Sequence, residues 1–227
     1  GYGLFYVVLL GSARWPGQAL FAASFNHGFS AAGALMRRLG AFRGYSGAWM
    51  GFSRETLAKI GGIERVAFKA ADDYALGVAV REAGIEIGLL RRLAELREPD
   101  ADLLETVRHF FKWGVVIRGA AAPVFAAAFA HSAVMFLFVV SAVWAACSGR
   151  RWAAWLYLAG AGCRIAAAAL QDRVLIGRFL PVGLYLTLPA TDLGQFPFWL
   201  ATLPIDRFTW RGKSYRIKPG GRVEVFN

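Results

Sequence analysis

Two adjacent carboxylates, Asp72 and Asp73, stand in the otherwise apolar stretch 70–77 of a chain with 15 acidic and 26 basic residues. Neighbouring carboxylates repel each other, and a buried ionised carboxylate is costly unless it is paired, hydrogen-bonded or used in a reaction. One interpretation is helix capping, with Asp72 as N-cap and Asp73 in the first turn of a helix over 74–83. The other is a catalytic base. The two are compatible, because a helix N-terminus can support an ionised carboxylate.

A second group of candidates follows at His109–Trp113. His109 and Lys112 are three residues apart and share one face of a helix predicted over 103–112. A cation beside an aromatic ring such as Trp113 can bind a phosphate or stack on a sugar. The same residue types also mark the interface of a membrane, so both interpretations stay open here.

Metal ligands are not evident in the sequence. Asp100 and Asp102 form an Asp-x-Asp pattern, which holds a divalent metal in nucleotide-sugar enzymes, but here it directly precedes the helix at 103. Helix capping is the favoured interpretation, and we place no metal there. Cys147, Cys163 and three scattered histidines lack the spacing of a Cys/His site, and both thiols are expected to be free and buried.

The elements that would position these residues alternate between strands and helices over residues 1–113, which predicts an α/β layer structure. A lone His27 interrupts the first helix and is more often a packing residue than a catalytic one. Gly47 lies in a glycine-punctuated strand, where glycine permits close approach of the backbone to a ligand or marks a bulge. The expected strands are 1–11, 43–52 and 85–90, and the expected helices are 18–39, 53–62 and 74–83.

The second half of the chain indicates a membrane protein. Hydrophobic residues make up 57% of the chain and the mean hydropathy is +0.43, too apolar for an ordinary soluble domain. Residues 120–147 contain no charged side chain and exceed the roughly 20 residues that cross a bilayer. A second span is predicted over 152–170, with Arg164 inside it. The net charge of +11 favours contact with anionic lipid or phosphate, and no basic run or motif suggests nucleic acid.

The last apolar segment, 179–205, is broken by four prolines and contains Asp192. We predict an interfacial helix followed by a third, kinked segment, with Asp192 either a functional charge or the partner of Arg164 or Arg178. A β-hairpin is expected over 209–221. From Asp206 to the end, the chain carries six basic residues against Asp206 and Glu224, which favours the cytoplasmic side and a re-entrant or interfacial third segment.

The order of these features resembles the membrane-bound family 2 glycosyltransferases of GT-A fold, and most closely their ceramide glucosyltransferase-like group. Residues 71–74 resemble the Glu-Asp-Tyr motif of that family, and residues 109–113 resemble its (Gln/Arg)-x-x-Arg-Trp motif. The glycine-rich step at 47–62 and the basic tail at 210–221 are also similar.

The resemblance implies an inverting transferase that moves a sugar, glucose from UDP-glucose by expectation, to a membrane lipid such as ceramide. The fold expected is a partial α/β GT-A domain over 1–113, transmembrane and interfacial helices over 114–208, and a basic tail over 209–227. The protein would be a multi-pass membrane protein whose catalytic part faces the cytoplasm. Nucleotide-sugar donor, lipid acceptor and bilayer are its expected partners.

The same resemblance assigns roles to individual residues. Asp73 aligns with the catalytic base, which deprotonates the acceptor hydroxyl. Asp72 replaces the usual Glu and would support it. His109 and Lys112 replace Gln/Arg and Arg, and Lys112 can offset diphosphate charge without a bidentate fork. Trp113 would stack near donor or acceptor, with Gly47 close by, and His27 falls where the ceramide-type enzymes have an active-site histidine.

One part of the family pattern is missing from this sequence. Such enzymes bind the nucleotide and Mg²⁺ or Mn²⁺ through an earlier Asp and an Asp-x-Asp, but only Glu55 and Glu64 are acidic before Asp72. We therefore expect a fragment that is inactive by itself. The rival hypothesis is a non-catalytic membrane scaffold or transporter subunit, with Arg164 and Asp192 as its functional charges. The sequence that precedes Gly1 would discriminate between the two.

Overall fold

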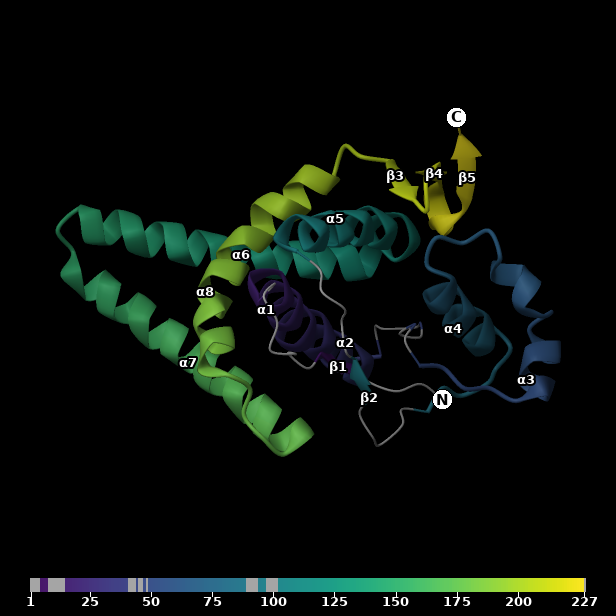
Figure 1. The fold of residues 1–227 in the computed structure, drawn as a ribbon, viewed down its shortest axis with the longest axis horizontal. Helices are drawn as coiled ribbons and strands as arrows, with labels where there is room; N and C mark the ends of the chain where they lie inside the picture. Colours follow the sequence, from purple (N-terminus) through teal and green to yellow (C-terminus); the bar gives the residue numbers. More distant parts are fainter. Residues whose placement is uncertain are drawn as a thin grey trace.

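The described part of the protein is mostly helical and includes two small sheets. The computed structural model describes residues 5–7, 15–40, 44, 47, 49–88, 94–96 and 102–226. Two long helices, α6 (Ala122–Cys147) and α7 (Arg151–Ile176), extend to one side of the molecule (Figure 1). The short helices α3 (Arg54–Lys59) and α4 (Asp72–Glu82) lie at the other side, near the C-terminal sheet.

The first helical segment, predicted over 18–39, is confirmed as α1 (Trp15–Ser24), η1 (Phe25–Ser30) and α2 (Ala31–Arg38). The predicted interruption at His27 is a π-helical turn, η1, within an otherwise continuous helix. Such single π turns widen a helix locally and are frequent at functional sites. The segment packs against α5 and α8 and forms the centre of the larger core.

The two segments predicted to span a membrane form the helices α6 and α7, which a short turn with Gly149 at φ +82° connects. Both helices are long and apolar enough to cross a membrane. Only 17% and 11% of their most apolar windows are buried within the protein, so large side chains such as Trp144 and Trp155 face outward. Such continuous exposed apolar surface suits contact with lipid.

Both cysteines are free thiols, but the prediction that they are buried is wrong. Cys147 ends α6 and Cys163 lies in the middle of α7, and both are exposed because they point away from the contacts between the helices.

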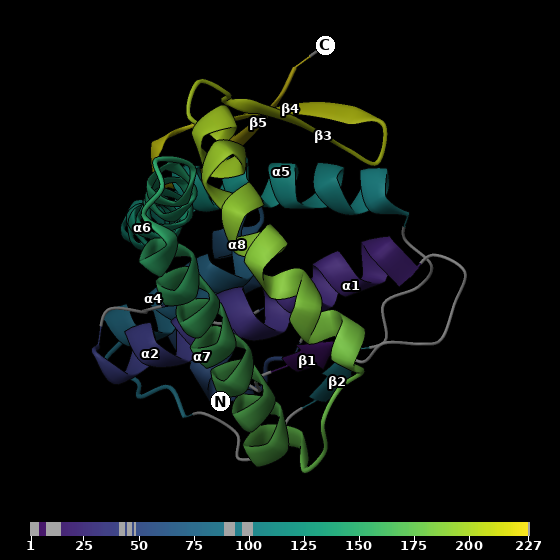
Figure 2. The same cartoon turned by 90° about the vertical axis from the view of Figure 1, so that its left-hand side faces the viewer.

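The prediction of two separate segments over 179–205 is wrong. A single helix, α8 (Val182–Thr202), contains both Pro189 and Pro197. Each proline removes one backbone hydrogen bond, and packing of α8 against α1, α6 and α7 keeps the helix continuous across both positions. The three helices α6, α7 and α8 contact one another, and in Figure 2 α6 is seen end-on beside α7 and α8.

The expected α/β layer is only partly present in the described residues. Strand β1 (Phe5–Val7) pairs in parallel with β2 (Ala94–Leu96). Residues 85–88 form no strand, because Ile87 instead packs into the core of α4 beside Leu76 and Val80. Within the predicted strand 43–52, Met50 makes an isolated bridge and residues 51–52 are irregular. Residues 1–4, 8–11, 43, 45, 46, 48, 89 and 90 lie outside the described part, and the GT-A identification stays a prediction.

The remaining predicted helices are confirmed. Ser53 caps α3, and its side chain accepts a hydrogen bond from the Thr56 backbone. The helix predicted over 103–112 continues further, as α5 (Leu103–Ala120). Asp102 caps it in a capping box with Glu105, as the capping interpretation of this carboxylate predicted, while Asp100 lies outside the described residues. The division of the chain at residue 113 stays a prediction and falls within α5.

The tail forms a three-stranded antiparallel sheet, one strand more than the predicted hairpin. Its strands are β3 (Arg207–Trp210), β4 (Lys213–Ile217) and β5 (Val223–Phe226). Arg211 and Gly212 form the two-residue turn between β3 and β4 with φ of +48° and +74°, values that match the twist of a hairpin. The sheet lies over α5 (Figure 2).

Candidate active site

The acidic pair occupies the first turn of α4. The N-cap is Ala71, not Asp72 as predicted, because Asp72 is already the first helical residue. The Asp72 carboxylate accepts a hydrogen bond from the Asp73 backbone N–H at 2.9 Å, and Asp73 Oδ1 accepts one from Tyr74 N–H at 2.7 Å. The two side chains therefore satisfy N–H groups that the start of a helix leaves without partners.

A glycine-containing segment passes directly over this helix start. A Cβ added to Gly44 would lie 2.8 Å from the Tyr74 Cα, and one added to Gly47 would lie 2.8 Å from Asp73 Oδ2. The backbone of Gly47 also hydrogen-bonds the Asp73 carboxylate. At Gly44 a side chain would collide with the Tyr74 backbone, and at Gly47 it would collide with the Asp73 side chain, so glycine permits the close approach at both positions. The structure thus places Gly47 beside Asp73.

The two carboxylates differ in environment. Asp72 is exposed, whereas Asp73 is partly buried. Burial raises the pKa of Asp73 above its ordinary value, and the neighbouring Asp72 charge raises it further, while hydrogen bonds from the Tyr74 and Gly47 backbones oppose the rise. A carboxylate with a raised pKa that still accepts hydrogen bonds as an anion has the properties of a general base.

The C-terminal tail holds the segment that leads into the acidic pair. Ala70 N–H donates to the Gly221 carbonyl at 2.8 Å, and Val223 N–H donates to the Phe68 carbonyl at 2.9 Å. The Lys69 ammonium donates to the Gly220 carbonyl at 2.7 Å. The tail consequently connects residues 68–70 to α5, against which it also packs.

The second candidate group, on α5, faces a different neighbour. The Trp113 ring lies about 6 Å from the rings of Phe21, Phe25 and Phe29, at 6.1, 6.2 and 6.1 Å between centroids. The His109 ring lies 4.6 Å from that of Trp113. The structure therefore places Trp113 against α1 and η1 and not against Asp73.

Burial also affects the two basic groups of α5. It lowers the pKa of His109, and the nearby Lys112 charge lowers it further. Burial alone lowers the pKa of Lys112. Both side chains are half-buried. An anionic group that approached them would meet the Lys112 ammonium with little competing solvent, while the lowered pKa favours the neutral form of His109, which can still donate a hydrogen bond.

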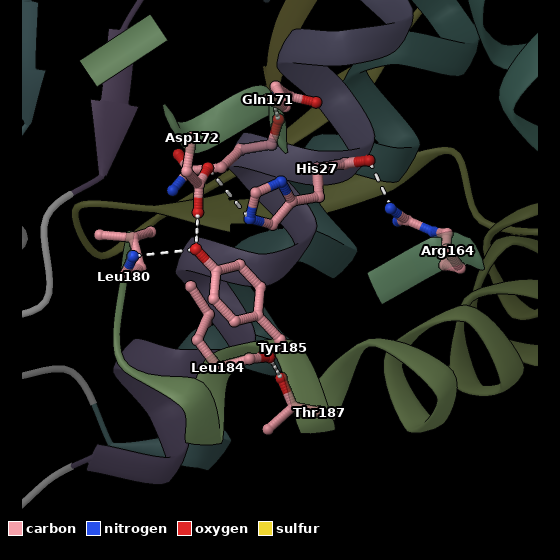
Figure 3. A network of polar contacts seen from close by, with 9 residues as sticks. His27, Arg164, Gln171, Asp172, Leu180, Leu184, Tyr185 and Thr187 are labelled. Atoms are coloured by element: carbon pink, nitrogen blue, oxygen red, sulfur yellow. Dashed lines mark hydrogen bonds and ion pairs between the residues drawn. The ribbon is translucent and has the colours of Figure 1, made fainter. Parts of the chain in front are cut away.

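His27 belongs to a buried polar network between η1, α7 and α8 (Figure 3). Its Nε2 lies 3.6 Å from Asp172 Oδ1, and both side chains are fully buried. The Tyr185 hydroxyl donates to Asp172 Oδ2 at 2.6 Å and accepts from the Leu180 N–H at 2.9 Å. Burial, with a smaller effect of the Arg164 charge, lowers the pKa of His27 to about 4, so the imidazole is neutral near neutral pH.

Sequence reasoning did not single out Asp172 or Tyr185. A carboxylate at the end of an apolar span was the available signal for Asp172, since intramembrane carboxylates are rarely without function or partner. Nothing in the local sequence distinguishes Tyr185 from other aromatic residues of α8.

Two side chains of α7 bind the backbone of η1. Arg164 Nη2 donates to the His27 carbonyl at 3.1 Å, and Gln171 Nε2 donates to the Asn26 carbonyl at 2.9 Å. Arg164 also forms an ion pair with Asp192 at 3.1 Å. Of the two partners predicted for Asp192, Arg164 and Arg178, the structure therefore shows Arg164. These contacts fix the π-helical turn against α7.

A cavity of about 950 Å³ lies between α1, η1, α2, α5, α6 and α8. His27, Trp113 and Arg164 all contribute to its lining, which is otherwise mostly apolar. The structure thus brings His27 and Trp113 to one cavity, although they are far apart in the sequence.

A divalent metal does not fit the described residues. Among them, no three His, Cys, Asp or Glu side chains come close enough to hold a metal ion.

Comparison with known proteins gives one match. A model of glycosyl transferase family 21 matches residues 11–223, nearly the whole chain. The matched range includes the acidic pair, α5, both long apolar helices and most of the tail. Searches of curated proteins and of solved structures found no match.

Proposed function

Because the chain belongs to glycosyl transferase family 21 and is a glycosyltransferase, we propose that it transfers glucose from UDP-glucose to a membrane lipid such as ceramide. The observation that carries the proposal is Asp73: a partly buried carboxylate with a raised pKa at the N-terminus of α4, held by backbone N–H groups of Tyr74 and Gly47. A carboxylate so placed can accept the proton of a lipid hydroxyl.

In the proposed reaction, the hydroxyl oxygen of the lipid attacks the anomeric carbon of the sugar from the side opposite the diphosphate. The new carbon–oxygen bond forms as the bond to the diphosphate breaks, and UDP leaves with the bonding electrons. The hydroxyl proton passes to Asp73, and the anomeric configuration inverts. Asp72 supports the base, since its negative charge contributes to the raised pKa of Asp73.

The remaining candidates would bind substrate. Lys112 on α5 would offset the charge of the diphosphate, His109 would bind the donor or acceptor by a hydrogen bond, and Trp113 would offer an aromatic face to either. His27, neutral and oriented beside Asp172, would contact the acceptor. Mg²⁺ or Mn²⁺ is expected to neutralise the donor diphosphate, but the described residues do not fit it and we assign no step to it.

The proposed location is a multi-pass membrane protein with its catalytic part on the cytoplasmic side. Two spans, α6 and α7, return the chain to the side from which it entered. The hydrogen bonds between residues 220–223 and 68–70 support a tail on the same side as the acidic pair, where its basic residues also favour the cytoplasm. A re-entrant or interfacial α8 is consistent with this arrangement.

The rival interpretation, a non-catalytic scaffold or transporter subunit, does not account for the family membership. The two charges that it relied on, Arg164 and Asp192, pair with each other. No specific observation favours it.

The test is Asp73→Asn, measured as transfer of radiolabelled glucose from UDP-glucose to ceramide in membranes that contain the protein expressed from its complete gene. Loss of a general base lowers kcat by about 10²–10⁴-fold. Glu82→Gln is the control, because Glu82 is an exposed carboxylate at the other end of the same helix, and near-normal activity is expected of it. Activity that survives Asp73→Asn would remove Asp73 from the role of base.

A further inference from the structure

The cavity of about 950 Å³ is built from matching stripes of residues on three helices. Helix α6 contributes Val124, Ala127, Ala128 and His131, which are spaced as one face of a helix. Helix α8 contributes an equivalent stripe over residues 187–199, and α5 one over 103–117. Small side chains on α6 and at Gly194 on α8 keep the space between the helices wide. The cavity is therefore a consequence of side-chain size at helical spacing.

The mostly apolar lining favours a hydrocarbon ligand over water or a polar ligand. A water molecule in a protein interior needs two to four polar partners, which most of this surface does not offer. Of the charged and polar groups at the cavity, Arg164 is engaged by Asp192 and by the His27 carbonyl. The volume is near the upper end of the roughly 300–1,000 Å³ typical of small-molecule sites. A long apolar ligand fits both the volume and the lining.

The cavity lies beside a helix apolar enough to span a membrane, and the chain that leads from it reaches the acidic pair within a few residues. It borders α6, one of the two helices apolar enough to span a membrane. At the start of α5, two residues of its lining are exposed to solvent, Leu103 to 50% and Val107 to 39%. Met36 of α2 lines the cavity, and eight residues later Gly44 lies against Tyr74, so these points are at most about 28 Å apart.

We propose that this cavity binds the alkyl chain of the acceptor lipid. The inference rests on the proposed transfer to a lipid and adds where the hydrocarbon part of that lipid is held. In this assignment His27 and Trp113 both contact the alkyl chain, because both line the cavity. Asp73 is not part of the lining.

Two glycines allow the cavity to be filled without disturbing its walls. A Cβ added to Gly194 of α8 or to Gly33 of α2 meets no atom within 4 Å, and both residues line the cavity. Gly194→Leu and Gly33→Leu should therefore fill it from two different helices. Gly162→Leu is the matched control, because Gly162 is also helical and open but lies on α7 outside the lining.

The binding experiment uses the protein in phosphatidylcholine vesicles and a hexadecanol analogue with a diazirine at the end of its chain. After photolysis, mass spectrometry maps the labelled residues. We expect labelling of the cavity lining in the unmodified protein and in Gly162→Leu, competition by added ceramide, and loss of that labelling in both cavity-filling variants. Labelling that persists in both variants, or that responds to phosphatidylcholine but not to ceramide, would overturn the proposal.

The kinetic experiment uses the same variants. Both cavity-filling variants should raise KM for a hexadecanol acceptor on the order of tenfold, because they occupy the space of its long chain. KM for octanol, whose shorter chain fills less of the cavity, should be nearly unchanged. Photolabelling does not require sugar transfer, so the two proposals fail separately. Cavity labelling without any transfer to lipid would refute the proposed function alone, and transfer to lipid with labelling elsewhere would refute the cavity assignment alone.

Discussion

Substitution of Gly221 by alanine tests whether the tail holds the segment that precedes the acidic pair. Gly221 has φ +76°, and a Cβ there would lie 2.8 Å from the Ala120 Cβ and 3.0 Å from the Ala120 Cα, at the end of α5. The left-handed backbone costs a non-glycine residue about 1–2 kcal/mol. Overpacking against a backbone atom costs about 1–3 kcal/mol more. We therefore expect Gly221→Ala to lower the free energy of unfolding by roughly 2–5 kcal/mol.

Gly212→Ala provides the control that separates the two contributions. Gly212 also has a positive φ, +74°, in the same sheet, but a Cβ there meets no atom within 4 Å. It should lose only the backbone contribution of about 1–2 kcal/mol. The difference between the two variants, about 1–3 kcal/mol, measures the contact of the tail with α5.

Thermal unfolding of the purified protein in detergent is the assay. A change of one kcal/mol shifts Tm by about 2–4 °C at this chain length, so the two variants should differ by roughly 2–12 °C. Because Gly221 accepts the hydrogen bond from Ala70, only Gly221→Ala should also lower kcat. Equal losses of stability in Gly221→Ala and Gly212→Ala would refute the reasoning.

Three further predictions concern charges and buried polar groups. The proposed base acts when ionised, so activity should be lost as pH falls through the raised pKa of Asp73, above the usual value of about 4. Asp72→Asn removes a charge that raises this pKa and should move the acid limb of kcat/KM to lower pH; a stationary limb would contradict the assignment. Tyr185→Phe removes the hydrogen bonds to Asp172 and Leu180 and should cost about 1–3 kcal/mol in thermal unfolding, whereas an unchanged Tm would show that the network adds no stability. Arg164→Gln or Asp192→Asn alone should cost about 3–5 kcal/mol, and the double variant less than the sum; additive losses would contradict the ion pair.

Matched controls exist for the last two predictions. Tyr157→Phe changes a half-buried tyrosine of α7 that contacts the Phe138 ring, and little change in Tm is expected. Arg65→Gln breaks an exposed ion pair with Glu82, which should contribute no more than about 1 kcal/mol. Losses in these controls that match those in the buried sites would point to a general effect of substitution.

The sequence by itself determined the helices and caps that depend only on residues close together in the chain. Composition over about 26 residues predicts α6 and α7, because burial in lipid requires a continuous run of apolar side chains. Capping chemistry predicts the start of α5 at Asp102, since the Asp102 side chain accepts a hydrogen bond from the Glu105 N–H of the first turn. The order of motifs was sufficient to indicate a glycosyltransferase, as the family match shows.

Only the tertiary structure decided which distant residues meet. His27 and Asp172 come into contact because α1, η1 and α7 pack together, and no local periodicity encodes that contact. Strand 85–90 was predicted from its apolar residues, yet Ile87 serves the core of α4 instead, because burial satisfies an apolar side chain in any backbone conformation. The difference between Asp72 and Asp73 was likewise decided by packing. Their sequence positions are adjacent, but the glycine segment approaches only Asp73, and burial is what raises its pKa.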